Sequence, residues 1–171
     1  MERITDKYVF FYGSEFSNWY DCRFKYHDHM FHNSEQAFMW EKALFFDDQI
    51  IAEMILQTPN PYANKQLGRQ VRGFDADKWE LESFSVMVAV NFAKFSQNKE
   101  LTTLLLSTGD KVLVEASPTD KIWGIGMHWK DDNCLDPKNW RGTNWLGEAL
   151  MEVRYILKPS EINQIQWKDL N

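Results

Sequence analysis

Apolar and polar positions follow a helical period over residues 34–46. The apolar side chains at that spacing are Ala37, Phe38, Ala43, Leu44 and Phe45. Ser34 predicts an N-cap serine, and Glu35 in the first turn suits the positive end of the helix dipole. Residues seven apart lie two turns on, so Glu35 and Lys42 share one side of the helix with Phe38. Taken alone, this face is typical of a surface carboxylate and a surface amine flanking a core aromatic.

Other stretches of the chain show further helix patterns and shorter strand patterns. The predicted helices are 47–55, opened by Asp47 and Asp48, then 62–71, 79–95, 98–105 with Asn98 as its cap, and 144–157, ended by Pro159. The predicted strands are 8–12, 22–26 and 111–116. The His-rich stretch 27–32 is expected to form a turn, and residues 127–141 a polar excursion. The tail after Ser160 reads as a weak helix or an extended strand.

This order of elements predicts an α+β fold with more helix than strand. The chain has 171 residues, enough for one domain with a substantial core. No repeat, low-complexity tract or linker interrupts it. We therefore expect a single compact, mainly helical domain over residues 1–171, with a small β-sheet and a core from about residue 8 to residue 158.

Aromatic residues make up 15% of the chain, including 8 Trp and 12 Phe. So many large rings indicate either a heavy core or a pocket that stacks a planar ligand, and composition leaves both open. The net charge is −6, which argues against a global basic footprint for nucleic acid but leaves a local basic patch possible.

The two cysteines, Cys22 and Cys134, form neither a disulfide framework nor a zinc motif. We expect two free thiols in a reducing compartment. No secretory signal and no apolar run of membrane-spanning length is present. The sequence therefore predicts a cytoplasmic protein that does not enter a membrane.

The strand at 111–116 leads directly into a segment of Pro, Asp, Trp and Gly. Ser117 to Asp120 leaves the strand, and residues 122–126 follow with Trp123, Gly124 and Gly126. A rigid strand often presents active-site groups in the loop behind it. This loop is therefore a second place, besides the helix at 34–46, to look for chemistry.

Several separated stretches together resemble the NADAR or YbiA-like superfamily. They are Phe11-Tyr12-Gly13, Phe16-Ser17-Asn18, Ser34-Glu35-Gln36 with Lys42-Ala43, Leu67-Gly68-Arg69, Phe74-Asp75 with Trp79, Ala93-Lys94-Phe95, Thr108-Gly109-Asp110, residues 113–118 with Asp120, residues 123–126, Trp140-Arg141-Gly142, and residues 150–154. Each piece alone is weakly specific. The resemblance is specific because the pieces follow in order along nearly the whole chain.

The resemblance implies the YbiA-like fold and N-glycosidase chemistry, the hydrolysis of a bond between a ribose carbon and an amino group or heterocycle. Two substrate branches are implied. One cleaves ribosylamino-pyrimidine phosphates of riboflavin synthesis, and the other removes ADP-ribose from guanine in nucleic acid. The riboflavin branch has Ser-Glu-His where this chain has Ser34-Glu35-Gln36. The expected partner is therefore a small ribosyl phosphate or ADP-ribosyl substrate, with ADP-ribosylated nucleic acid as a further possibility.

Cleavage of a ribosyl C–N bond builds positive charge on the sugar and negative charge on the leaving nitrogen. By analogy with the paired carboxylates of glycosidases, we nominate Glu35 and Asp120 as the catalytic pair, with the choice of which activates water left open. We expect neither a metal nor another cofactor.

The expected substrate-binding residues are Gly13, Ser17, Asn18, Lys42, Arg69, Trp79, Trp123 and Gly124. Lys42 and Arg69 are candidates for the phosphate, and Trp79 and Trp123 for stacking on the base. Each also has an ordinary structural role, in turns, on helix surfaces or in the core. The alternative function is a non-catalytic module that binds ADP-ribose or a nucleotide, which would need the cations and aromatics but not both carboxylates.

Overall fold

A three-stranded sheet joins the start of the chain to its middle. In the computed structural model, which describes residues 2–158, the strands are β1 (Glu2–Ile4), β2 (Tyr8–Phe11) and β5 (Val112–Glu115). The order is β1-β2-β5, with β1 antiparallel to β2 and β2 parallel to β5. Phe11 lies opposite Glu115, so both strands end at the same edge. This edge carries Glu115 and the loop behind it.

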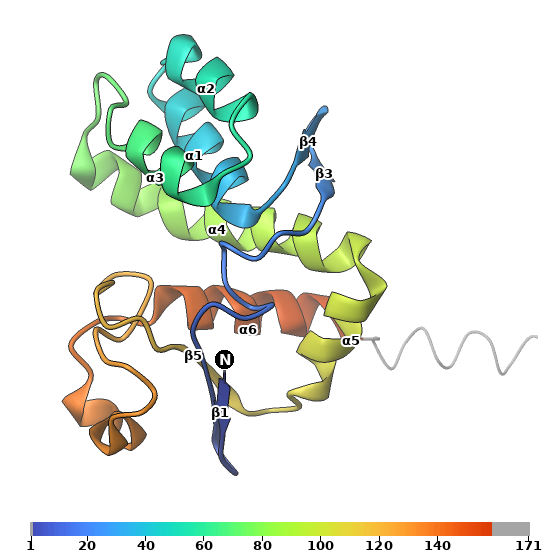
Figure 1. Cartoon of the computed structure of the whole chain (residues 1–171), viewed down its shortest axis with the longest axis vertical. Coiled ribbons are helices and arrows are strands. Elements are labelled where there is room, and N and C mark those ends of the chain that lie inside the picture. The colour runs from blue at the N-terminus through green and yellow to red at the C-terminus, as the bar shows by residue number, and fades with distance from the viewer. Residues whose placement is uncertain (1, 159–171) are drawn as a thin grey trace, which may run out of the picture.

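Helices form the larger part of the fold. They are α1 (Ser34–Phe45), α2 (Gln49–Leu56), α3 (Pro61–Gly68), α4 (Ala76–Gln97), α5 (Lys99–Ser107) and α6 (Trp145–Leu157). In Figure 1, α1, α2 and α3 lie above the long helix α4, and α6 runs below it. α6 packs against both α4 and β5, so α4 separates the upper helices from α6 and the sheet. The predicted single, mainly helical domain is confirmed.

The helix starts differ in detail from the sequence-based expectations. Ser34 is not the N-cap of α1, because the side chain of Asn33 accepts the capping bond from the Gln36 N–H at 2.9 Å. The hydroxyl of Ser34 instead donates to Asn91 on α4 at 3.1 Å. Asp48 caps α2 as predicted. The sequence pattern identified the helices correctly but placed the first cap one residue late.

Two other helix boundaries were also predicted imprecisely. α3 ends at Gly68 rather than at residue 71, and α4 begins at Ala76, capped by Asp75, so that Trp79 lies inside its first turn. Asn98 precedes α5 but makes no side-chain capping bond. Its amide instead donates to the carbonyl of Lys94 at 2.8 Å, which ties α5 to the end of α4.

The sheet content is larger than the sequence pattern predicts. The stretch expected to be a His-rich turn contains β4 (His29–Phe31), which pairs with β3 (Phe24–Tyr26) in a hairpin. β1 was not predicted either. Only one residue of β4, Phe31, is buried, so its pattern carries almost no strand signal. The predictions for Pro159 and for the tail after Ser160 lie outside the described residues.

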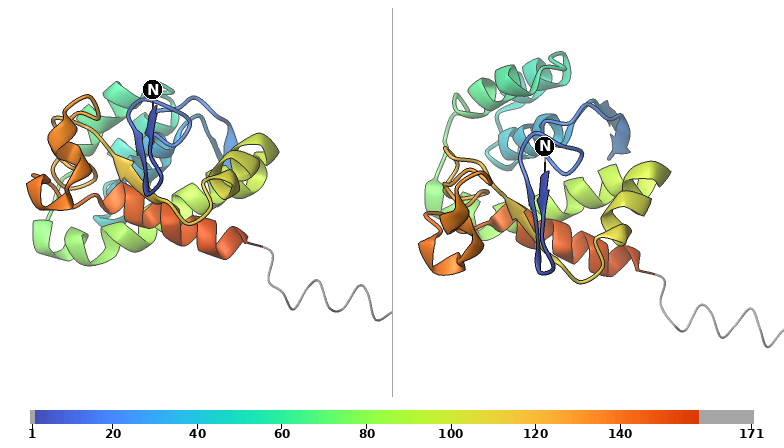
Figure 2. Two further views of the ribbon diagram at one scale, coloured as in Figure 1. Left: turned by 90° about the horizontal axis from the view of Figure 1, so that it is seen from below. Right: turned by 60° about the horizontal axis from the view of Figure 1, so that its bottom comes forward.

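Between β5 and α6 the chain forms a long loop with two short 3₁₀ turns, Asp132–Leu135 and Pro137–Asn139. Both views in Figure 2 place this loop at one end of the molecule, opposite α5. Within residues 2–158, no helix combines the length and the apolar character that a membrane crossing requires.

Candidate active site

Glu35 stands in the first turn of α1 with its carboxyl group almost fully buried. Its backbone N–H donates to the carbonyl of Asn18 at 3.0 Å, which fixes the start of the helix. Its Oε1 has no hydrogen-bond partner among the described residues. Burial raises the pKa of Glu35 to about 7, and the charge of Asp120 acts in the same direction. The charge of Lys65 and a side-chain hydrogen bond from Trp19 act in the opposite direction.

Glu115 is the last residue of β5, and it is buried at the edge where β2 and β5 end. Its backbone N–H donates to Oδ1 of Asn144 at 2.9 Å. Its Oε2 is a second buried carboxyl oxygen without a partner in residues 2–158. Burial raises the pKa of Glu115 to about 8, with a further increase from the charge of Asp120 and an opposing effect of Lys65.

Asp120 lies in the loop after β5 and is partly exposed. Its Oδ1 accepts hydrogen bonds from the backbone N–H groups of Ile122 at 3.0 Å and Trp123 at 2.8 Å. Its Oδ2 lies 3.7 Å from Nζ of Lys65 on α3. The carboxylate is therefore oriented by main-chain donors and faces a cation from another element.

We call Glu35, Glu115, Asp120 and Lys65 the carboxylate cluster. Asp120 and Lys65 influence the charge of both glutamates. Burial disfavours the charged form of a carboxyl group, so the pKa values of the two glutamates lie close to neutral pH, at about 7 for Glu35 and about 8 for Glu115. The cluster therefore combines proton donors with a carboxylate, which is the requirement for acid–base hydrolysis.

Close backbone packing fixes the loop that carries Asp120. A Cβ on Gly124 would lie 3.0 Å from the carbonyl oxygens of both Glu115 and Asp120, so a side chain there would force the loop away from β5. The N–H of Ile125 donates to the Glu115 carbonyl at 3.0 Å. The ring of Trp123 packs edge-on against Phe38, with 5.2 Å between ring centroids. Gly124 and Trp123 thus hold in place the loop that carries Asp120.

The loop before β3 holds the start of α1 from the other side. The buried ammonium of Lys94 donates to the carbonyls of Glu15 at 2.8 Å and Ser17 at 2.9 Å. Burial lowers the pKa of Lys94 to about 7. The side chain of Asn18 points into the core, where its Oδ1 accepts from Asn91 at 3.2 Å. Gly13 is exposed and adopts a positive φ of 66° at the turn after β2.

The other predicted substrate-binding residues differ in whether they act on the carboxylate cluster. Arg69, the C-cap residue of α3, is exposed and its charge acts on Glu35. Lys42 donates to the carbonyl of Gly68 at 2.9 Å and lies over the ring of Phe74, 3.9 Å from its centroid. Trp79 is buried, and its ring packs against Phe38 with a centroid distance of 5.3 Å. The structure therefore brings Arg69 to the cluster and gives Lys42 and Trp79 packing contacts.

Three residues of the site were missed by sequence reasoning. They are Glu115, which lies in the predicted strand 111–116, Lys65, which lies in the predicted helix 62–71, and Trp19, which precedes the predicted strand 22–26. The sequence signals that could have found them are a glutamate closing an otherwise apolar strand and a lysine four residues before Arg69 on one helix face.

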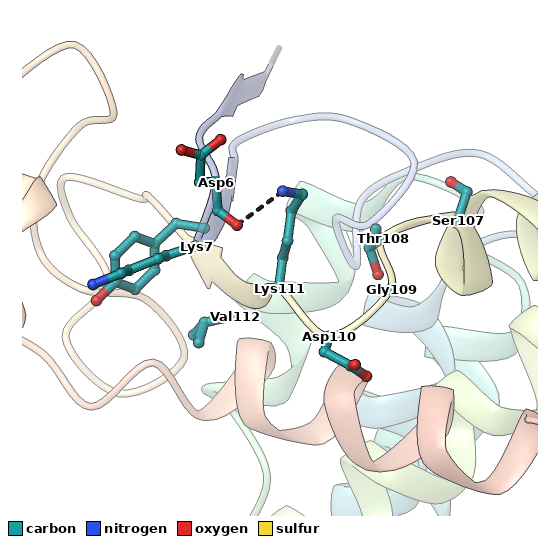
Figure 3. A pocket seen from close by; sticks show the side chains of 9 residues that line it. Asp6, Lys7, Ser107, Thr108, Gly109, Asp110, Lys111 and Val112 are labelled. Atoms are coloured by element: carbon teal, nitrogen blue, oxygen red, sulfur yellow. Dashed lines mark hydrogen bonds between the residues drawn. The ribbon is translucent and has the colours of Figure 1, made fainter.

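A shallow open pocket of about 570 Å³ lies elsewhere, between the β1–β2 turn and the segment joining α5 to β5. Figure 3 shows its lining residues, among them Lys111, whose ammonium donates to the backbone carbonyls of Thr5 and Asp6 at 2.9 Å. None of the predicted site residues lines it. We place the chemistry at the carboxylate cluster because the titratable groups with unsatisfied oxygens are there. In the described part of the chain, no group of three or more His, Cys, Asp or Glu is arranged to hold a metal ion.

Comparisons with known proteins identify the family of the chain. The NADAR domain model matches residues 10–158. The chain is 49% identical over 123 residues to "Protein irg-1" of Caenorhabditis elegans, an alignment that covers 71% of this chain and 58% of that relative. It is 39% identical over 163 residues to "N-glycosidase R617" of Acanthamoeba polyphaga mimivirus, covering 88% of this chain and 96% of the relative.

A solved structure supports the same assignment. The NMR structure of the E. coli protein YbiA aligns with a TM-score of 0.74 and 28% identity, covering 95% of this chain and 90% of that chain. The predicted YbiA-like fold is therefore confirmed. Since the family model also spans most of the sequence, the chain belongs to the NADAR domain family.

Proposed function

We propose that this protein is an N-glycosidase that hydrolyses the C–N bond between a phosphorylated ribose, or ADP-ribose, and an amino group or heterocycle. Relatives named N-glycosidase support the reaction class. The observation that carries the proposal is the carboxylate cluster, in which the oriented carboxylate of Asp120 acts on two buried glutamates whose pKa values are raised to about 7 and about 8. A module that only bound nucleotides would gain nothing from two buried acids with unsatisfied oxygens.

Asp120 is the anion of the proposed reaction. As the C–N bond breaks, positive charge grows on the ribose C1′, and a nearby carboxylate stabilises it. Water then adds to C1′ and loses a proton to Asp120. The two main-chain donors to Oδ1 hold the carboxylate in place, so it needs no rearrangement when the charge develops.

Glu35 is the proposed proton donor. The leaving nitrogen takes the electron pair of the broken bond and needs a proton. A donor works best when its pKa lies near the working pH, and that of Glu35 is about 7. After the reaction, the proton that Asp120 has taken returns to Glu35 through solvent. Two carboxyl groups with different environments and different roles are a general pattern in enzymes.

Glu115, whose pKa is higher at about 8, is proposed to stay neutral and to donate a hydrogen bond to a ribose oxygen. Lys65 pairs with Asp120 and places positive charge where the phosphate of a substrate can meet it. Arg69 extends that charge along α3. The reaction is proposed to take place in the cytoplasm, which the free thiols of Cys22 and Cys134 support.

The decisive experiment offers the protein two substrates in separate reactions, a ribosylamino-pyrimidine phosphate and DNA with ADP-ribosylated guanine. We expect the release of ribose phosphate or of ADP-ribose from at least one of them, detected by mass spectrometry. Asp120→Asn should abolish the release and serves as the matched control. If neither substrate loses its sugar but the protein binds ADP-ribose, the function is that of a non-catalytic reader.

A further inference from the structure

Trp19 and Tyr62 meet at the surface next to the carboxylate cluster. Their ring centroids lie 6.5 Å apart and their planes are at 75°, so the edge of one ring meets the face of the other. Trp19 is 44% exposed and Tyr62 is 61% exposed. We call this pair the aromatic corner. Single exposed aromatics are common on proteins, but here two come together from separate segments, the loop before β3 and the first turn of α3.

The aromatic corner adjoins residues of the proposed active site. The side chain of Trp19 acts on the carboxyl group of Glu35 and lowers its pKa. Tyr62 precedes Lys65 by three residues and Arg69 by seven, and this spacing puts the three side chains along one face of α3. A molecule lying along this face therefore meets a flat apolar surface at one end and two cations at the other.

Trp79 and Trp123, the tryptophans expected from the sequence to stack on the base, do not expose a comparable ring surface. Trp79 is only 9% exposed and packs among phenylalanines. The ring of Trp123 is engaged by Phe38 and Trp145, with centroid distances of 5.2 and 5.8 Å. A planar ligand near Glu35 has its open ring faces at Trp19 and Tyr62 instead.

We propose that the aromatic corner is the leaving-group subsite of the enzyme and that it selects a planar heteroaromatic base over an aliphatic amine. This inference rests on the proposed N-glycosidase function. A base stacked on one ring meets the edge of the other, an arrangement that aromatic groups prefer. It also lies beside Glu35, which donates the proton to the leaving nitrogen. Stacking on a protein aromatic typically contributes about tenfold to a hundredfold in affinity.

The test measures binding first, because binding does not depend on turnover. The probes are guanosine 5′-monophosphate, which carries a base, and ribose 5-phosphate, which does not, each titrated by calorimetry. We expect Tyr62→Ala to weaken the binding of guanosine monophosphate by about tenfold and the binding of ribose phosphate by less than about twofold. Tyr62→Phe keeps the ring and should bind both like the wild type. Tyr155→Ala removes a 75% exposed tyrosine on α6 and is the matched control.

The second measurement is steady-state kinetics on whichever ribosyl substrate the wild type hydrolyses. Tyr62→Ala should raise KM with little change in kcat. Trp19→Phe should instead lower kcat, because it keeps a ring but removes the indole N–H that acts on Glu35. Thermal melts control for folding.

The inference is overturned if Tyr62→Ala and Trp19→Ala leave guanosine monophosphate binding unchanged. It is equally overturned if they weaken both probes alike, or if the wild type does not bind the base-containing probe. A protein that binds the probes as expected but releases no sugar contradicts the proposed function and leaves the aromatic corner as a base-binding site.

Discussion

The ammonium of Lys65 lies 3.7 Å from a carboxylate oxygen of Asp120, across the contact between α3 and the loop after β5. These two residues are 55 positions apart in the chain, and each also acts on the charge of the buried glutamates. An isolated surface pair of this length would contribute little to stability. Here both charges also act on the protonation of Glu35 and Glu115, so the pair matters for the chemistry of the candidate site more than for stability.

Removing charge at either proposed catalytic carboxyl should stop turnover without unfolding the protein. Asp120→Asn and Glu35→Gln keep shape and most hydrogen-bonding capacity but remove the anion or the transferable proton. Each should lower kcat by about a hundredfold or more, the scale of one lost acid–base or electrostatic group. The double variant should fall by less than the product of the two, since members of one catalytic unit are not additive. Near-normal kcat in a folded single variant would remove that residue from the mechanism.

The pH profile should report Glu35 directly. Because its pKa is about 7, kcat should fall as pH rises through that value and the proton donor is lost. The residual activity of Glu35→Gln should lack this alkaline limb. A wild-type profile that stays flat from pH 6 to 9 would exclude Glu35 as the donor.

Glu115 should make the protein less stable as pH rises. Its pKa is about 8 in the fold and 4.5 as the ordinary value, so the folded state keeps a proton that the unfolded chain releases. Stability attributable to this group is fully present below pH 4.5 and is lost progressively as pH rises to about 8. Since each unit of pKa shift corresponds to roughly 1.4 kcal/mol, the loss amounts to several kcal/mol as an order of magnitude.

Glu115→Gln should therefore be more stable than the wild type at pH 8 and should lose that advantage near pH 5. Thermal or urea unfolding at the two pH values measures it, with Glu148→Gln, an exposed position on α6, as the control. The kcat of Glu115→Gln should fall less than that of Glu35→Gln, because the amide at position 115 can still donate a hydrogen bond. A variant that is destabilised at pH 8 would show that the carboxyl group makes stabilising contacts.

Arg69 and Lys42, the two cations expected to bind phosphate, should have separable effects. Arg69→Gln should raise KM for a phosphorylated substrate by about tenfold more than for its dephosphorylated form, because the exposed guanidinium is available to the phosphate. Lys42 was proposed for the same role from sequence. Since its ammonium binds the Gly68 carbonyl, Lys42→Ala should instead lower the melting temperature and change KM for both forms alike. A phosphate-selective effect of Lys42→Ala would restore it as the anion-binding residue.

Binding to unmodified nucleic acid should be weak. The net charge of −6 opposes duplex DNA, and the cations at the site are few and local. Fluorescence anisotropy with a plain duplex at physiological salt should give a Kd in the range of non-specific binding or weaker, roughly 10⁻⁶ M or above. Tight, sequence-independent binding would reveal a basic surface that neither the charge nor the site explains.

The sequence predicted much of the fold because the helices carry clear periodicity and caps. It failed at β4, whose residues alternate too little to signal a strand, and at Ser34, because Asn33 can cap equally well and is one residue earlier. Both are local choices between neighbouring polar residues, which tertiary contacts decide. In the case of Ser34, the bond to Asn91 across to α4 determines the outcome.

The site was predictable only in part. Glu35 and Asp120 were nominated by analogy with the paired carboxylates of glycosidases. In the structure Lys65 lies 3.7 Å from Asp120, and its charge also acts on Glu35. Glu115 gave only a weak signal, because a charged residue that ends a buried strand usually turns to solvent, whereas here a loop closes over it through Gly124. Long-range packing of this kind is not visible in local patterns.

The face of α3 that carries Tyr62, Lys65 and Arg69 belongs to a short helix packed on α1 and α2, while Glu115 and Asp120 are held by β5 and its loop. Substitutions can accumulate on the outer face of α3 without disturbing the strand. Natural selection can therefore exchange one preferred leaving group for another while the hydrolytic reaction is inherited unchanged. Proteins descended from one ancestor can therefore differ in substrate while they keep the same reaction.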